Sequence, residues 1–320
     1  MSDLIIDVHS HPLLDDYVRA MNGGANRREI AGVTLPPWSV AQHLETMDEH
    51  GIGACVLSLP SLADALVGDE GRKTARRLNE QLAAMVAEHP TRFAAFAVVP
   101  MDDMDAAITE MAYAVDELGL DGVCGAPHRH GVYLGDAAYD VWFEEMNRRA
   151  VTLFVHPGMP AYFDPAASRL NVAILEFMFE TTRMVTSMVL SGAKARFSNV
   201  KIIAPHGGGT IPYLAHRIAI GAQMPWAFKD GVHVSVPEVT AALGSFYYDL
   251  TASTSPAQLD AIRHLVPTER LLMGFDYPMM PAMTIAPAIA GLATYAGFDD
   301  ADKLAIRRDN ALTLFPRMAQ

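Results

Sequence analysis

Near its start the chain carries Leu4-Ile5-Ile6-Asp7-Val8-His9-Ser10-His11, a short apolar run that ends on two histidines. Residues two apart on an extended strand point to the same side, so His9 and His11 can approach one metal ion together. Three later apolar runs end in the same way, on His156, His206 and Asp276. Metal-binding residue types at the ends of four strands indicate one site that is assembled from distant parts of the sequence.

Short apolar runs alternate with longer amphipathic ones along the whole chain. We expect strands at 4–9, 53–59, 93–99, 121–125, 151–156, 200–205, 246–250 and 270–275. We expect helices at 38–50, 71–89, 103–118, 137–149, 171–191, 210–220, 256–265 and 283–296. Eight strand-then-helix units, with strands apolar enough to be buried on both faces, predict a (β/α)₈ barrel. An open doubly wound sheet is the alternative, which the lack of a Gly-x-Gly-x-x-Gly turn after the first strand makes weaker.

The length and the connecting segments fit one large domain. The chain has 320 residues, and a (β/α)₈ barrel commonly runs to roughly 250 residues or more as one unit. We therefore expect a single domain over 1–320, with terminal helices at about 299–316. The long loop at 12–36 should cover the active face, and the loop at 222–245 should lie on the opposite face or at a dimer contact.

Composition excludes several classes of partner. The net charge of −13 argues against nucleic acid or an anionic membrane as the main partner. Cys55 and Cys124 lie in apolar runs, which is typical of buried thiols in a reducing compartment. The first residues have neither a basic segment nor a long apolar one, and the apolar stretch at 281–297 is too short to span a bilayer. We expect a cytoplasmic protein.

The carboxyl ends of the strands converge on one mouth of such a barrel, so His9, His11, His156, His206 and Asp276 should meet there. A single histidine at a strand end is more often a cap or a core residue than a ligand. The joint pattern at four strand ends is much harder to obtain by chance. Imidazole nitrogens with one carboxylate suit Zn²⁺, with Mn²⁺, Fe²⁺ or Co²⁺ as alternatives.

Four motifs carry a resemblance that covers nearly the whole chain. They are Ile-Asp-Val-His-Ser-His-Pro (6–12), Phe-Val-His-Pro-Gly (154–158), Pro-His-Gly-Gly-Gly-Thr-Ile-Pro-Tyr-Leu (205–214) and Gly-Phe-Asp-Tyr-Pro (274–278). The chain resembles the amidohydrolase superfamily, in the branch of metal-dependent decarboxylases related to aminocarboxymuconate-semialdehyde decarboxylase. A further motif, Glu-Thr-Thr-Arg (180–183), is also similar to 6-methylsalicylate decarboxylases.

The resemblance implies roles for the residues that match its motifs. His9, His11, His156 and Asp276 would bind one divalent metal, and His206 would stand beside it as a proton-handling residue. Some relatives carry Glu where this chain has His9. A histidine at this position favours zinc. Arg217 would reach a substrate carboxylate in the neighbouring subunit, which implies a homodimer, with a tetramer as the alternative. Arg217 can equally well be an ordinary surface residue on a helix.

Other residues are expected to complete the site. A family arginine on the first barrel helix is replaced here by His43 or a nearby residue, which puts the muconate semialdehyde in doubt as the substrate. His128 and His130 follow the fourth strand and should line the pocket, although one of them can be a solvated loop residue. Trp38 can form an aromatic wall or simply pack. Asp249 should hydrogen-bond to a ligand from behind.

Three classes of function remain open from the sequence. The first is a non-oxidative decarboxylase of a small aromatic or unsaturated carboxylic acid, such as an ortho-hydroxybenzoate, in which His206 or Asp276 handles the proton. The second is a metal-dependent hydrolase or hydratase of a lactone, amide or ring-derived acid on the same site, which the fold alone does not separate from the first. The third is a barrel that binds a ligand without turning it over.

Overall fold

A computed structural model describes residues 4–25, 27–60, 62–164, 168–227 and 235–319. All eight predicted barrel strands form. They are β1 (Ile5–Ser10), β4 (Ile52–Leu57), β5 (Phe93–Ala95) continuing as β6 (Ala97–Val98), β7 (Val123–Gly125), β10 (Thr152–Val155), β11 (Lys201–Ala204), β12 (Tyr247–Asp249) and β13 (Leu271–Leu272).

The strands pair in chain order and in parallel. β5 pairs with β4 while β6 pairs with β7, so this interrupted strand joins the two arcs of the sheet. The remaining seam lies between β1 and the segment after β13. There the amide of Val8 donates to Met273 O at 2.9 Å and the amide of Asp276 donates to His9 O at 2.7 Å. The sheet is therefore a closed barrel, as predicted, and its closing seam places Asp276 beside His9.

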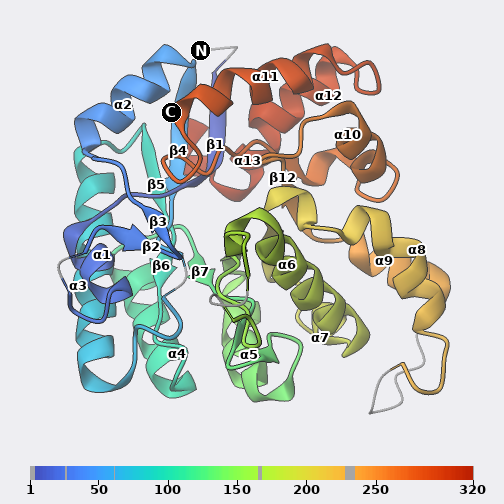
Figure 1. Ribbon diagram of the computed structural model, residues 1–320, viewed down its shortest axis with the longest axis horizontal. Coiled ribbons are helices and arrows are strands. Elements are labelled where there is room, and N and C mark those ends of the chain that lie inside the picture. The colour runs from blue at the N-terminus through green and yellow to red at the C-terminus, as the bar shows by residue number, and fades with distance from the viewer. Residues whose placement is uncertain (1–3, 26, 61, 165–167, 228–234, 320) are drawn as a thin grey trace.

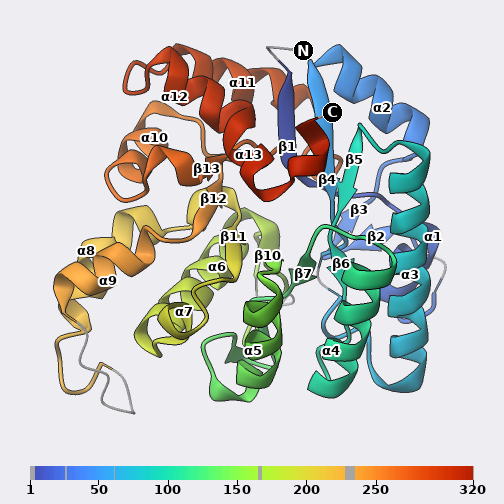
Figure 2. The same ribbon diagram turned by 180° about the vertical axis from the view of Figure 1, so that it is seen from behind.

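A ring of helices surrounds the strands (Figures 1 and 2). It consists of α2 (Val40–Glu49), α3 (Gly68–Glu88), α4 (Met104–Ala112), α5 (Asp140–Arg149), α6 (Val172–Leu190), α8 (Ile211–Gly221), α10 (Pro256–Arg263) and α11 (Ile285–Thr294). Polar caps fix several starts: the Ser39 side chain accepts from the Gln42 amide, and Asp103 accepts from the amides of Asp105 and Ala106. Helix α3 buries Ala75, Leu78 and Leu82 at the spacing of one helical face.

Segments expected to be loops contain further elements. Residues 12–36 hold α1 (Asp15–Met21) and the hairpin of β2 (Glu29–Ile30) and β3 (Val33–Thr34). A second hairpin, β8 (His128–Arg129) and β9 (Val132–Tyr133), follows β7, and α7 (Ala193–Arg196) follows α6. The segment 222–245 contains α9 (Val236–Leu243), which packs against α6 and α8; residues 228–234 lie outside the described part of the chain.

The barrel interior is filled by alternate strand residues and by the C-terminal tail. The tail forms α12 (Asp300–Leu304), a π-helical turn (Ala305–Asp309), α13 (Asn310–Leu314) and a last turn (Pro316–Ala319). Its Phe315 meets the ring of Phe96 edge-on at 5.6 Å, and Phe96 stacks on Phe154 at 5.5 Å. The tail therefore closes the floor of the barrel, while the helices of the ring pack on the outer side of the strands.

Candidate metal centre

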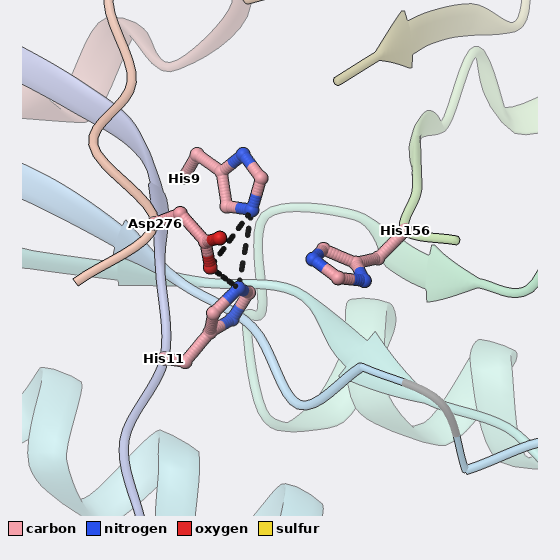
Figure 3. A group of neighbouring side chains, drawn as sticks. All are labelled: His9, His11, His156 and Asp276. Atoms are coloured by element: carbon pink, nitrogen blue, oxygen red, sulfur yellow. Dashed lines mark hydrogen bonds and ion pairs between the residues drawn. The ribbon is translucent and has the colours of Figure 1, made fainter. Parts of the chain in front are cut away.

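Four side chains meet at the mouth of the barrel (Figure 3). His9 lies on β1 and His11 directly follows it, His156 follows β10, and Asp276 follows β13. One ligand atom from each lies within 4.8 Å of all the others. The Nε2 atoms of His9 and His11 are 3.1 Å apart, and His11 Nε2 is 2.9 Å from Asp276 Oδ1. All four side chains are buried.

Hydrogen bonds fix the protonation of all three imidazoles. His11 Nδ1 lies 3.0 Å from Ser58 O and His156 Nδ1 lies 2.7 Å from Pro157 O. A carbonyl oxygen can only accept, so each Nδ1 carries the proton and each Nε2 presents a lone pair. His9 Nδ1 faces Asp249 Oδ2 at 3.0 Å with the same result. Three lone pairs therefore point at one place.

This arrangement fits a divalent cation. His156 Nε2 and Asp276 Oδ1 are buried, and neither has a hydrogen-bond partner among the described residues. The lone pairs of His9 and His11 face each other at 3.1 Å, which is repulsive without a positive charge between them. Buried polar atoms normally have partners, and one cation held by three imidazoles and a carboxylate would satisfy all four groups.

The charges of the cluster are also those of a metal site. Burial lowers the pKa of His9 and of His156, so both rings are neutral. Burial alone would raise the pKa of Asp276, but the imidazoles of His9, His11 and His206 outweigh it and hold the pKa well below its usual value. Neutral imidazole and ionised carboxylate are the ligating forms of these residues.

His206 stands beside the cluster and outside its four-atom set. Its Nε2 lies 3.6 Å from Asp276 Oδ2, and its Nδ1 is buried without a hydrogen-bond partner in the described chain. The turn that carries it needs glycine: at Gly208, where φ is +74°, a Cβ would lie 2.0 Å from the Tyr248 ring. The ring of His206 therefore lies beside the metal ligands with one nitrogen unpartnered.

Asp249 supports two parts of the site from behind. It is fully buried, and one carboxylate oxygen faces His9 Nδ1 while the other accepts from the amides of His206 and Thr251. Burial would raise its pKa, but the neighbouring His9 brings the pKa below its usual value. An ionised Asp249 orients His9 and the His206 turn together.

A cavity of about 460 Å³ is lined by His128 and by Gly158 and Met159, which closely follow His156 in the chain. Its walls come from α1, the β2–β3 hairpin, the segments after β4, β7 and β10, and helix α6, and its lining is mostly small and apolar. The ring of Phe177, one of the lining residues, lies 6.3 Å from the His156 ring. The loop at 12–36 therefore covers the active face, as the sequence indicated, and a small aromatic molecule fits this lining.

One buried polar network borders the cavity. Glu180 on α6 is fully buried, and its carboxylate lies 2.8 Å from His128 Nε2 and 2.9 Å from the Tyr133 hydroxyl. Arg183 donates to the same carboxylate at 2.5 Å. The amide of Gly131 donates to His128 Nδ1 at 3.3 Å. Both nitrogens of His128 therefore have protein neighbours, and His128 lines the cavity.

The other predicted pocket residues are not among those that line the cavity. Trp38 Nε1 donates to His43 Nδ1 at 3.0 Å, and His43 Nε2 lies 3.0 Å from Ser10 Oγ, so both nitrogens of His43 are bonded within the protein. Burial lowers the pKa of His43 to about 3. His130 is largely exposed, 3.8 Å from Asp64. Arg217 is exposed on α8, outside the residues that line the cavity.

Sequence reasoning did not identify three groups that shape the site. Glu180 appeared only as part of a motif, since a glutamate in a helix is usually solvated. Ser58 holds His11 through its carbonyl, and Asp7 accepts from the amides of His9 and Phe275. The one available signal was the position of Asp7, two residues before His9 on the strand.

Comparison with known proteins identifies the family. The family model described as amidohydrolase matches residues 6–317, so the chain belongs to the amidohydrolase family. Similar proteins include the decarboxylase macB of Penicillium terrestre, 31% identical over 98% of this chain and 95% of that protein. The 6-methylsalicylic acid decarboxylase of Penicillium expansum is 29% identical over 98% of this chain and 96% of its own length.

A solved structure shows the same fold. The dihydroxybenzoic acid decarboxylase of Polaromonas, solved with manganese and the inhibitor 2-nitroresorcinol, superimposes with a TM-score of 0.79 at 24% identity, over 98% of this chain and 97% of that one. The similar proteins named as decarboxylases favour a decarboxylase over a hydrolase. In the described residues, none of the helices is long and apolar enough to cross a membrane.

Proposed function

We propose that this protein is a metal-dependent, non-oxidative decarboxylase of a small aromatic carboxylic acid of the ortho-hydroxybenzoate class. The observation that carries the proposal is the cluster of three imidazole lone pairs and one carboxylate beside the unpartnered His206 Nδ1. An apolar cavity approaches this cluster through Phe177, whose ring lies 6.3 Å from the His156 ring. The relatives named as decarboxylases of hydroxylated aromatic acids support the same class of substrate.

His9, His11, His156 and Asp276 would hold the metal, which when bound supplies positive charge to a substrate oxygen. The small apolar residues of the cavity and the ring of Phe177 would hold the aromatic ring and exclude water. His206 would then deliver a proton to the ring carbon that carries the carboxyl group, because Asp276, the other candidate, is held in its ionised form. The bond between this carbon and the carboxyl carbon breaks, its electron pair returns to the ring, and CO₂ leaves.

The test is mass spectrometry of the metal-loaded protein after incubation with hydroxybenzoates, unsaturated dicarboxylates and lactones. We expect loss of CO₂ from at least one hydroxybenzoate and no reaction of the lactones. Gain of water by a lactone, with every carboxylic acid unchanged, would contradict the proposal and point to a hydrolase with the same metal site.

For the metal, we propose zinc, because three imidazoles and one carboxylate in a compact set suit this ion. The manganese in the related Polaromonas enzyme makes Mn²⁺ the alternative, with Fe²⁺ and Co²⁺ behind it. Elemental analysis of protein purified without added metal, followed by reconstitution of the stripped protein with each ion, distinguishes them.

We further propose a single-domain cytoplasmic enzyme that forms a homodimer through α8. Helix α8 carries the exposed apolar side chains of Tyr213 and Ile220 as well as the exposed Arg217, and the exposed Trp226 follows it. Arg217 would then reach the partner's site. The described cysteines, Cys55 and Cys124, are free and buried, as suits a reducing compartment. Native mass spectrometry tests the dimer, and a monomer at micromolar concentration would contradict it.

A further inference from the structure

A second cavity, of about 320 Å³, lies at the opposite end of the barrel from the metal cluster. Lys201 starts β11, Tyr247 starts β12 and Arg270 directly precedes β13, and all three line this cavity. The other ends of the same strands lead to His206, Asp249 and Asp276. At about 3.3 Å per residue along a strand, the two sites are roughly 15 Å apart.

Three cationic side chains line this second cavity. Lys194 from α7 is only 8% exposed, with its Nζ 5.3 Å from the centre of the Phe246 ring. The Arg270 guanidinium lies 5.1 Å from the centre of the Tyr247 ring and donates to Ser245 O at 2.9 Å. Lys201 completes the set, and Ser198 adds a hydroxyl group to the lining.

No carboxylate forms an ion pair with any of these three cations within the described part of the chain. Most other arginines in this chain of net charge −13 do have an acidic partner, as Arg72, Arg92 and Arg317 show. Burial, together with the nearby Arg270 and Lys201, lowers the pKa of Lys194 to about 8. The fold therefore keeps three like charges together at a cost, and an anion in the cavity would remove that cost.

We propose that the Lys194–Lys201–Arg270 cavity binds a small multivalent anion of the phosphate class, either inorganic phosphate or the phosphate group of a metabolite. Two ammonium groups and a forked guanidinium match several oxygens of a tetrahedral dianion. The Ser198 hydroxyl in the lining can donate to the same oxygens. A monovalent carboxylate would leave most of the positive charge uncompensated. The inference is independent of the reaction at the metal centre.

The test is calorimetric titration of the metal-loaded protein with inorganic phosphate at pH 7 and constant ionic strength. We expect saturable binding in the wild type. Loss of one charge-assisted contact should weaken it about tenfold or more in Lys194→Met and in Lys201→Met. Lys73→Met is the charge-matched control, because Lys73 is 64% exposed on α3, and it should bind as the wild type does.

Two further binding measurements locate the site and identify its natural ligand. Phosphate that binds at the metal centre would lose affinity in His156→Ala, whereas binding in the basic cavity should persist there. A titration with glycerol 3-phosphate distinguishes the two natural ligands. Tighter binding than that of inorganic phosphate indicates the phosphate group of a metabolite, and weaker binding indicates the free phosphate ion. If Lys194→Met does not fold, Arg270→Gln and Lys201→Met carry the test. Absence of saturable binding, or equal affinity in the cavity variants and the Lys73→Met control, overturns the proposal.

Discussion

His9 Nδ1 lies 3.0 Å from Oδ2 of Asp249, and both side chains are fully buried below the mouth of the barrel. The carboxylate accepts the imidazole proton, which leaves His9 Nε2 with a lone pair directed at His11 and Asp276. The same carboxylate holds the backbone amide of His206. One residue that would not touch the metal therefore orients both a proposed ligand and the proposed proton donor.

Asp249→Asn should weaken metal binding without abolishing it. The neutral amide of asparagine is a weaker hydrogen-bond acceptor than the carboxylate, and the substitution removes the charge that orients His9. Loss of such a supporting partner typically costs about 10–100-fold in metal affinity. Competition titration with a chelator measures the dissociation constant. Asp15→Asn is the control, since Asp15 is 87% exposed. Equal affinity in both variants would remove Asp249 from the metal site.

Substitutions at the cluster should separate ligands from the proton-handling residue. His156→Ala and Asp276→Ala each remove one of the four converging ligand atoms, so metal content and activity should fall together. His206→Ala should retain the metal and lose turnover by about 10²–10⁴-fold, the usual contribution of a positioned acid or base. Elemental analysis beside a CO₂-release assay makes the comparison. Loss of metal from His206→Ala would make His206 a ligand.

The barrel strands were predictable because each is a short, doubly buried apolar run, and the metal cluster was predictable because its members end such runs. Residues 15–21 and 236–243 were expected to be loop and are helices α1 and α9. They lie within Gly- and Pro-containing stretches, where the helical period covers only two turns and is hard to detect.

Contacts between distant segments could not be predicted. The residues at 299–316 were predicted to be terminal helices, but only the fold shows that Phe315 enters the barrel to meet Phe96. His43 stays a predicted substrate contact, and only the fold shows that its two nitrogens bond to Trp38 and Ser10. A single sequence states which residue types are present, and not which of several possible neighbours each one finds in space.

Glu180→Gln should destabilise the fold and loosen the substrate cavity. The fully buried carboxylate contacts His128, Tyr133 and Arg183, and weakening such charged hydrogen bonds costs about 1–3 kcal/mol. Urea unfolding at pH 7 measures the loss, with the exposed Glu49→Gln as control.

The same variant has a pH signature. Burial alone would raise the pKa of Glu180, but His128 and Tyr133 lower it below its usual value. Its contribution is therefore present above the unfolded pKa of about 4.3 and is lost as the pH falls through the folded pKa. The difference in unfolding free energy between wild type and Glu180→Gln should shrink on acidification, and a difference that stays constant would contradict the role of the charge.

Phe315→Ala should test the tail as the floor of the barrel. Phe315 is 1% exposed and packs on Phe96 inside the strands. Truncation of a buried phenylalanine costs about 3–5 kcal/mol. The free energy of unfolding in urea measures this, and Met283→Ala, at a side chain that is 80% exposed, should change little. Equal effects in the two variants would show that the tail is not needed to fill the barrel.

Lys194 should make the stability of the protein rise with pH in the alkaline range. Its folded pKa of about 8 lies below the value of about 10.4 for an unfolded lysine, because burial and the charges of Arg270 and Lys201 disfavour the ammonium form. Below pH 8 the folded state bears the full cost of the charge. Between pH 8 and pH 10.4 the unfolded chain binds more protons, so the free energy of unfolding increases, by about 3 kcal/mol at most.

Lys194→Met has no charge to lose, so it should be more stable than the wild type at pH 7, and this difference should vanish towards pH 10.4. Urea unfolding in phosphate-free buffers across this range measures both proteins, with Lys73→Met as the control whose curve stays parallel to the wild type. Parallel curves for Lys194→Met as well would mean that Lys194 keeps an ordinary pKa, because its ammonium group is then stabilised in the fold as well as it is in water.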